Sequence, residues 1–103
     1  MTRQALITDI QRISEIDCDA FGDDCYPLFF LRQACEIYGE LFRVAEDEQG
    51  TVVGYTLSAS KLEGRDAWIL VVAVDKRARG RRVATKLIED GLNILSLGGI
   101  QQV

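Results

Sequence analysis

The residues with the clearest chemical potential form one short basic segment, residues 75–86. Its cations are Lys76, Arg77, Arg79, Arg81, Arg82 and Lys86. Against the single Asp75 they give a local charge of +5, whereas the whole chain carries −4. A basic segment in an otherwise acidic protein predicts an anionic ligand at that place, rather than a surface that binds nucleic acid generally.

The composition removes several kinds of catalytic chemistry. The chain has no histidine, which excludes Ser-His and Cys-His nucleophilic schemes and most catalytic zinc sites. A proton acceptor must then be a carboxylate, a tyrosine, a water molecule or the substrate. Cys18, Cys25 and Cys35 are odd in number and lack the paired spacing of metal ligands. We therefore expect reduced thiols in a cytoplasmic protein and no metal site.

The basic segment is predicted to join a strand to a helix. Residues 67–74 are nearly all apolar, which indicates a strand covered on both faces at the centre of a sheet. A helical stripe follows at Val83, Ala84, Leu87, Ile88, Leu92 and Leu95. The first N–H groups of a helix lack intrahelical partners and carry partial positive charge, so a phosphate placed there would satisfy several donors. The residues alone leave two interpretations: a phosphate-bearing ligand, or a solvated loop without a ligand.

Two helices and a hairpin are predicted before that strand. Residues 4–7 favour a short strand, and the capping-box pattern from Thr8 to Gln11 favours the start of a helix. Pro27 suits the start of a second helix that ends at Gly39. A hairpin is then predicted, with strands over residues 41–45 and 52–58.

The chain of 103 residues allows one domain. Gly98 and Gly99 are predicted to end the last helix, and residues 100–103 to begin a strand parallel to residues 67–74. No apolar run is long enough for a membrane span, and the first residues lack the apolar stretch of a signal peptide. We expect no membrane partner.

The segment 73–88, AVDKRARGRRVATKLI, resembles the acetyl-CoA signature of the GNAT N-acetyltransferases. That signature is Arg or Gln, two residues, Gly, one residue, then Gly or Ala. Arg79 stands at its first position and Ala84 at its last. The predicted helices, hairpin and strand follow the family's order, and RVAE at 43–46 with VVGY at 52–55 is similar to its usual strand pair. The overall pattern is similar to the branch of ribosomal-protein alanine acetyltransferases.

The resemblance implies a GNAT-type α/β (α+β-like) fold, with a mixed, mostly antiparallel sheet and helices on both faces. Residues 1–103 would form a single incomplete domain that stops after the start of the fifth strand. Acetyl-CoA would be the co-substrate, and a primary amine of a small molecule or protein would accept the acetyl group.

The resemblance also implies a cofactor site made largely of main-chain groups. Amides of residues 80–85 would bind the pyrophosphate, residues 72–74 would pair with the pantetheine arm like an added strand, and an amide of that strand would polarise the thioester carbonyl. The implied cofactor-binding residues are Val72, Ala73, Val74, Arg79, Gly80, Arg81, Arg82, Val83, Ala84 and Thr85.

The sequence departs from the family pattern in ways that affect function. Arg82 stands where the signature has its first glycine, which we expect to weaken binding without abolishing it. Some members carry a catalytic glutamate at the position of Trp68, and the related branch carries one on the strand that would begin at Ile100, beyond Val103. No catalytic residue is therefore assigned.

Two other functions remain as alternatives. The chain could be a catalytically inactive, truncated domain that binds CoA weakly or acts as a dimerisation module. Nucleic-acid binding by the basic segment is the least favoured function, because the rest of the chain is acidic. Because an early stop would leave a sheet edge uncovered, we expect a homodimer.

Overall fold

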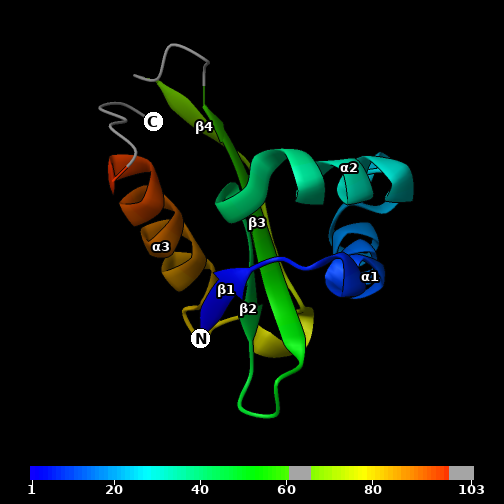
Figure 1. Cartoon of the computed structure of the whole chain (residues 1–103). Coiled ribbons are helices and arrows are strands. Elements are labelled where there is room, and N and C mark those ends of the chain that lie inside the picture. The colour runs from blue at the N-terminus through cyan, green and yellow to red at the C-terminus, as the bar shows by residue number, and fades with distance from the viewer. Residues whose placement is uncertain (61–65, 98–103) are drawn as a thin grey trace.

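The computed structural model describes residues 1–60 and 66–97 and has a sheet with helices on both sides (Figure 1). Within these residues the strand order is β1-β2-β3-β4, and every neighbouring pair is antiparallel. The strands are β1 (Thr2–Gln4), β2 (Phe42–Glu46), β3 (Val52–Ser60) and β4 (Ala67–Val74). The helices are α1 (Ile10–Phe21), α2 (Leu28–Tyr38) and α3 (Val83–Leu97). The predicted mixed fold is confirmed.

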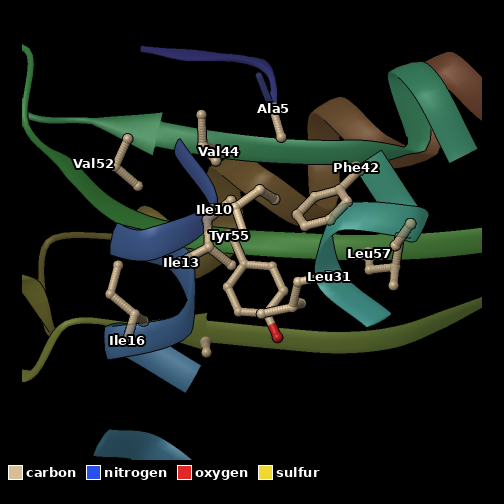
Figure 2. Close-up of a cluster of buried hydrophobic side chains, with 12 residues drawn as sticks. Ala5, Ile10, Ile13, Ile16, Leu31, Phe42, Val44, Val52, Tyr55 and Leu57 are labelled. Atoms are coloured by element: carbon tan, nitrogen blue, oxygen red, sulfur yellow. The ribbon is translucent and has the colours of Figure 1, made fainter. Parts of the chain in front are cut away.

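Helices α1 and α2 cover one face of the sheet through an apolar core. Figure 2 shows Phe42 and Tyr55 from the strands among Ile10 and Ile13 of α1 and Leu31 of α2. The Phe42 and Tyr55 rings lie 5.8 Å apart. Full burial of each large apolar side chain contributes about 1.5–3 kcal/mol. This core fixes the sheet against α1 and α2 and leaves the opposite face for α3.

Helix α3 packs on the other face, where β3 carries a glycine. A Cβ atom at Gly54 would lie 3.1 Å from the Ala73 carbonyl oxygen, 3.1 Å from Val83 Cγ1 and 3.3 Å from Leu87 Cδ1. The missing side chain therefore lets the first turns of α3 approach β3 and β4. Leu87, Gly91 and Leu95 form the buried side of the helix. Leu92, predicted on that side, is 39% exposed, because Gly91 takes the position nearest the sheet.

Strand β4 differs from the prediction of a covered central strand. It ends the order of the described strands, and Trp68 and Leu70 on it are 47% and 44% exposed. An apolar run predicts a strand but not its neighbours, because apolar side chains also occupy exposed positions. The features predicted for residues 98–103 lie outside the described residues.

The prediction of three reduced cysteines is wrong for two of them. Cys18 near the end of α1 and Cys25 after the turn Gly22–Asp24 form a disulfide, with Cα atoms 4.9 Å apart. The chain reverses in that turn, which brings the two thiols together although their spacing suggested no pairing. Cys35 is a free thiol whose Sγ lies 3.5 Å from the Ala5 carbonyl oxygen. Burial raises the pKa of Cys35, which keeps this thiol protonated.

The start of α1 also differs from the predicted capping box. The carboxylate of Asp9, rather than Thr8, accepts a hydrogen bond at its Oδ2 atom from the Leu6 N–H at 2.7 Å. Arg3 donates to both oxygens of the same carboxylate, at 2.7 and 3.0 Å. These contacts tie the start of α1 to β1.

No helix among residues 1–60 and 66–97 is long and apolar enough to cross a membrane.

Two glycine substitutions should change stability in opposite directions. Gly54→Ala would force the Ala73 carbonyl or Val83 to move, and overpacking of this kind costs about 1–3 kcal/mol. Gly91→Ala places its Cβ at an ordinary 3.8 Å from Ser58 Oγ within a helix, where alanine is favoured by about 0.5–1 kcal/mol. Thermal unfolding should show a lower Tm for Gly54→Ala and a higher one for Gly91→Ala. A Tm that does not fall in Gly54→Ala would contradict the close approach of α3.

Candidate functional site

The basic segment begins with a turn that Asp75 organises. The Asp75 amide donates to the Val53 carbonyl at 2.7 Å, which continues the pairing of β4 with β3. The Asp75 carboxylate accepts from the Arg77 amide at 2.9 Å and so caps the 3-10 turn Lys76–Ala78. Beyond this turn the chain passes through Arg79 and Gly80 and enters α3 at Val83.

Arg12 anchors this turn to the rest of the molecule. From α1 its Nε donates to the Val52 carbonyl at 2.9 Å, and its Nη2 donates to the Asp75 carboxylate. The amide of Arg77, the guanidinium of Arg12 and then the guanidinium of Arg77 hold the pKa of Asp75 well below its usual range. A charged carboxylate therefore links α1, the start of β3 and the basic loop.

The first amides of α3 face a pocket. The first intrahelical hydrogen bond runs from Lys86 N–H to the Arg82 carbonyl at 3.0 Å, so the amides of Val83, Ala84 and Thr85 precede it. The pocket has a volume of about 340 Å³ and is lined by Val74, Ala78, Arg79, Gly80, Arg82, Val83, Ala84 and Thr85. The end of β4 and the positive end of the α3 dipole thus meet at one cavity.

The structure brings most of the predicted cofactor residues together at this pocket, but three lie elsewhere. Arg81 lines an adjoining cavity of about 740 Å³, which shares Ala78 and Val83 with this pocket and includes the turn between β2 and β3. Ala73 is buried in the core opposite Tyr55, and Val72 is half-buried on β4. The sequence reasoning missed Ala78, whose burial in an otherwise charged loop brings it to the pocket wall. The one sequence feature that indicated this burial was its apolar side chain among charged neighbours.

The outer edge of β4 presents main-chain groups beside the pocket. Val74 lies opposite Gly54, Val72 lies opposite Thr56, and the next bond is from Asp75 N–H to the Val53 carbonyl. Opposed pairs in an antiparallel ladder alternate between those that exchange hydrogen bonds and those that do not. The N–H and C=O groups of Val72 and Val74 therefore point away from β3.

The register of β4 shifts just before these residues. Leu57 lies opposite Val71, whereas Ser58 lies opposite Ile69, so Leu70 is an extra residue in β4. Such a bulge bends a strand and increases its local twist. The bend separates the part of β4 that leads to the pocket from the part that carries Trp68.

Arg82 adopts the backbone conformation that makes glycine suitable at its position. Its φ is 63°, in the left-handed region, and it is the one non-glycine residue among those described with a positive φ. This conformation costs a residue with a Cβ about 1–2 kcal/mol. The glycine that the signature places here is thus explained by backbone geometry, and the arginine keeps that geometry under strain.

A fully buried carboxylate lies outside the predicted set. Asp17 of α1 accepts from the Tyr55 hydroxyl at 2.5 Å and from the Tyr26 amide at 2.7 Å. Burial first, and then Asp17, raises the pKa of Tyr55, so this phenol stays protonated and packs in the core. The spacing of Asp17 four residues after Ile13, on the apolar side of α1, was the sequence signal for its burial.

Replacing Arg82 by glycine should stabilise the protein. Arg82→Gly removes the cost of the left-handed conformation, so we expect about 1 kcal/mol of added stability and a higher Tm. Arg81→Gly is the control, because it removes a neighbouring arginine whose φ is not positive and should give no gain. Equal effects of the two substitutions in thermal unfolding would rule out backbone strain at Arg82.

The contribution of Asp75 to stability should depend on pH. Because its folded pKa is depressed below the ordinary value of 3.8, the stabilisation is complete above that value and is lost as the pH falls through the folded pKa. Asp75→Asn should therefore lower Tm at pH 7, and the difference from the native chain should shrink below about pH 4. Tm curves for both proteins from pH 7 to pH 2 would test this. A constant difference would show that charge plays no part.

Comparison with known proteins places this geometry in a family. The profile of the acetyltransferase (GNAT) family matches residues 7–102. Among solved structures, the chain is similar to Ard1 from Thermoplasma volcanium, with a TM-score of 0.85, 25% identity, and coverage of 97% of this chain and 66% of that one. It is also similar to Naa20 from Chaetomium thermophilum, solved with a bisubstrate analogue, with a TM-score of 0.78, 24% identity, and coverage of 97% and 58%.

A third similar structure is the diaminobutyrate acetyltransferase EctA from Paenibacillus lautus, solved with L-2,4-diaminobutyric acid and coenzyme A. Its TM-score is 0.81 at 19% identity, with coverage of 90% of this chain and 56% of that one. The chain thus spans about two thirds or less of the length of these three solved relatives.

No curated protein shows significant similarity to the sequence. The match over residues 7–102 and the shared fold show that this chain belongs to the GNAT acetyltransferase family.

Proposed function

We propose that this chain binds acetyl-CoA and is the cofactor-binding portion of an N-acetyltransferase that acts on a primary amine. The observation that carries the proposal is the pocket of about 340 Å³ in which the first amides of α3 meet the outward main chain of β4. Amides before the first intrahelical bond suit a diphosphate, and a strand edge suits an extended amide-containing arm.

The ligand would occupy these two features together. Its diphosphate would accept hydrogen bonds from the amides of Val83, Ala84 and Thr85, with the cationic side chain of Arg82 beside it. Its pantetheine arm would pair with the outward groups of Val72 and Val74. The thioester would then lie near the bulge at Leu70, where the strand bends.

Acetyl transfer in this arrangement requires direct attack by a neutral amine. The amine nitrogen bonds to the thioester carbonyl carbon, the carbon–sulfur bond breaks, and CoA leaves as a thiolate. The amine loses one proton to solvent or a base, and the thiolate gains one. Positioning of the two reactants and hydrogen bonding to the carbonyl oxygen would supply the catalysis. The resemblance leaves the base unassigned.

The acceptor is proposed to be a primary amine because EctA, which shares the fold, was solved with L-2,4-diaminobutyric acid. The amine of a small molecule and that of a protein are both compatible with the proposal. The homodimer and the cytoplasmic location remain predictions.

A CoA-binding domain without catalysis is the second candidate. Two observations favour it: the strained Arg82 in the wall of the pocket, and the lack of any carboxylate in the sequence of β4. Binding without turnover would select this candidate over the enzyme.

Acetyl-CoA should stabilise the native chain against heat. A ligand at a concentration 100 times its Kd adds about 2.7 kcal/mol. Ala84→Asp, which puts a carboxylate among the amides of the pocket, should abolish the shift, whereas Asn93→Asp adds the same charge on an exposed part of α3 and should preserve it. A native chain that shows no shift would refute acetyl-CoA binding.

A turnover assay would separate the enzyme from the non-catalytic domain. Release of free CoA thiol from acetyl-CoA after addition of diaminobutyrate or a peptide amine would show the enzyme, and binding without thiol release would show the non-catalytic domain.

A further inference from the structure

The outward carbonyl of Val74 already has a partner within the chain. Arg79 Nε donates to this oxygen at 3.2 Å. Val74 is the last residue of β4, and its carbonyl lies on the edge that points away from β3. The arginine therefore occupies the hydrogen-bonding position that an added strand would use next to the pocket.

The same arginine lines the pocket that holds the first amides of α3. Val74, Arg79 and Ala84 all contribute to its wall. A phosphate bound by the α3 amides would thus lie in the same cavity as the Arg79 guanidinium. A phosphate oxygen carries negative charge and can pair with a guanidinium through two parallel hydrogen bonds, whereas the Val74 carbonyl is neutral, so the phosphate would compete successfully for this side chain.

The neighbouring cations are placed differently. Arg77 contacts the Asp75 carboxylate at 3.4 Å, and Arg12 binds the same carboxylate and the Val52 carbonyl. Arg81 lines the adjoining cavity beside the turn between β2 and β3, and is not among the residues that line the pocket. Arg82 shares the pocket wall with Arg79, but it is Arg79 that donates a hydrogen bond to the edge of β4.

We infer that Arg79 is a specificity-determining residue that keeps the edge of β4 closed until a diphosphate draws its guanidinium away. The inference rests on the proposed function and adds an order of events to it. Diphosphate binding at the start of α3 frees the Val74 carbonyl, and the pantetheine arm then pairs with β4. The site thereby discriminates against thioesters that carry the arm without the phosphates.

Acetyl-pantetheine tests the inference, because it is neutral and lacks the diphosphate. Its affinity for the native chain and for Arg79→Met would be measured by calorimetry or ligand-observed NMR. Removal of the competing hydrogen bond should raise the affinity of the variant about 2- to 10-fold, the effect of one net hydrogen bond. Arg32→Met, which removes an exposed arginine from α2, should leave the affinity unchanged.

A second measurement uses the native chain and inorganic pyrophosphate. Saturating pyrophosphate should raise the affinity of the native chain for acetyl-pantetheine, because it holds Arg79 away from Val74. The same addition should have no such effect on Arg79→Met. A purely structural arginine would give neither the increase in the variant nor this loss of coupling.

The outcomes separate the inference from the proposed function. Higher acetyl-pantetheine affinity in Arg79→Met, together with loss of the pyrophosphate effect, supports the inference. If the native chain binds acetyl-CoA but Arg79→Met binds acetyl-pantetheine no better than the native chain, the inference is overturned and the function stands. If the native chain does not bind acetyl-CoA, both are overturned.

Discussion

The close contact of α3 with the sheet at Gly54 sets the geometry of the candidate site. Because β3 has no side chain there, Val83 and Leu87 pack directly over β3 and β4. The first amides of the helix are thereby held at the end of β4 instead of a side-chain width away. Neither the helix nor the strand alone makes an anion pocket with an adjoining strand edge. The pocket exists because the packing brings the two together.

Electrostatic contacts complete this arrangement from the other side of the sheet. Asp75 receives the Arg77 amide and the Arg12 guanidinium, so a carboxylate at the end of β4 is tied to α1. Lys76 adds a contact with Asp19 of α1 at 3.4 Å. The basic segment is therefore held by acidic groups on one flank, while Arg79, Arg81 and Arg82 line the two cavities. Without Asp75, a segment of otherwise the same composition would lose the carboxylate that binds Arg12 and Arg77 on that flank.

Much of the fold follows from local sequence patterns. Alternation and turn residues placed β2 and β3, and the recurrence of Ile10, Ile13 and Ile16 placed α1. Pro27 and Gly39 bounded α2 as expected, since proline suits a helix start and glycine adopts the positive φ found at its end. The predictions failed where long-range contacts decide the result. The Cys18–Cys25 disulfide and the exposure of Trp68 depend on where the chain turns and what neighbours β4, which spacing does not encode.

The sequence by itself determined the family resemblance, the position of the basic loop and the unusual arginine at residue 82. It could do so because charge, glycine spacing and helical periodicity are local properties of the chain. Only the tertiary structure decided which loop residues line the pocket, that Arg81 lines the adjoining cavity instead, and that Arg79 binds the Val74 carbonyl. Those outcomes depend on where each side chain points in a turn whose φ is 83° at Gly80 and 63° at Arg82. Backbone direction in such a turn is set by the packing of α3 against the sheet, so it could not be read from residue types alone.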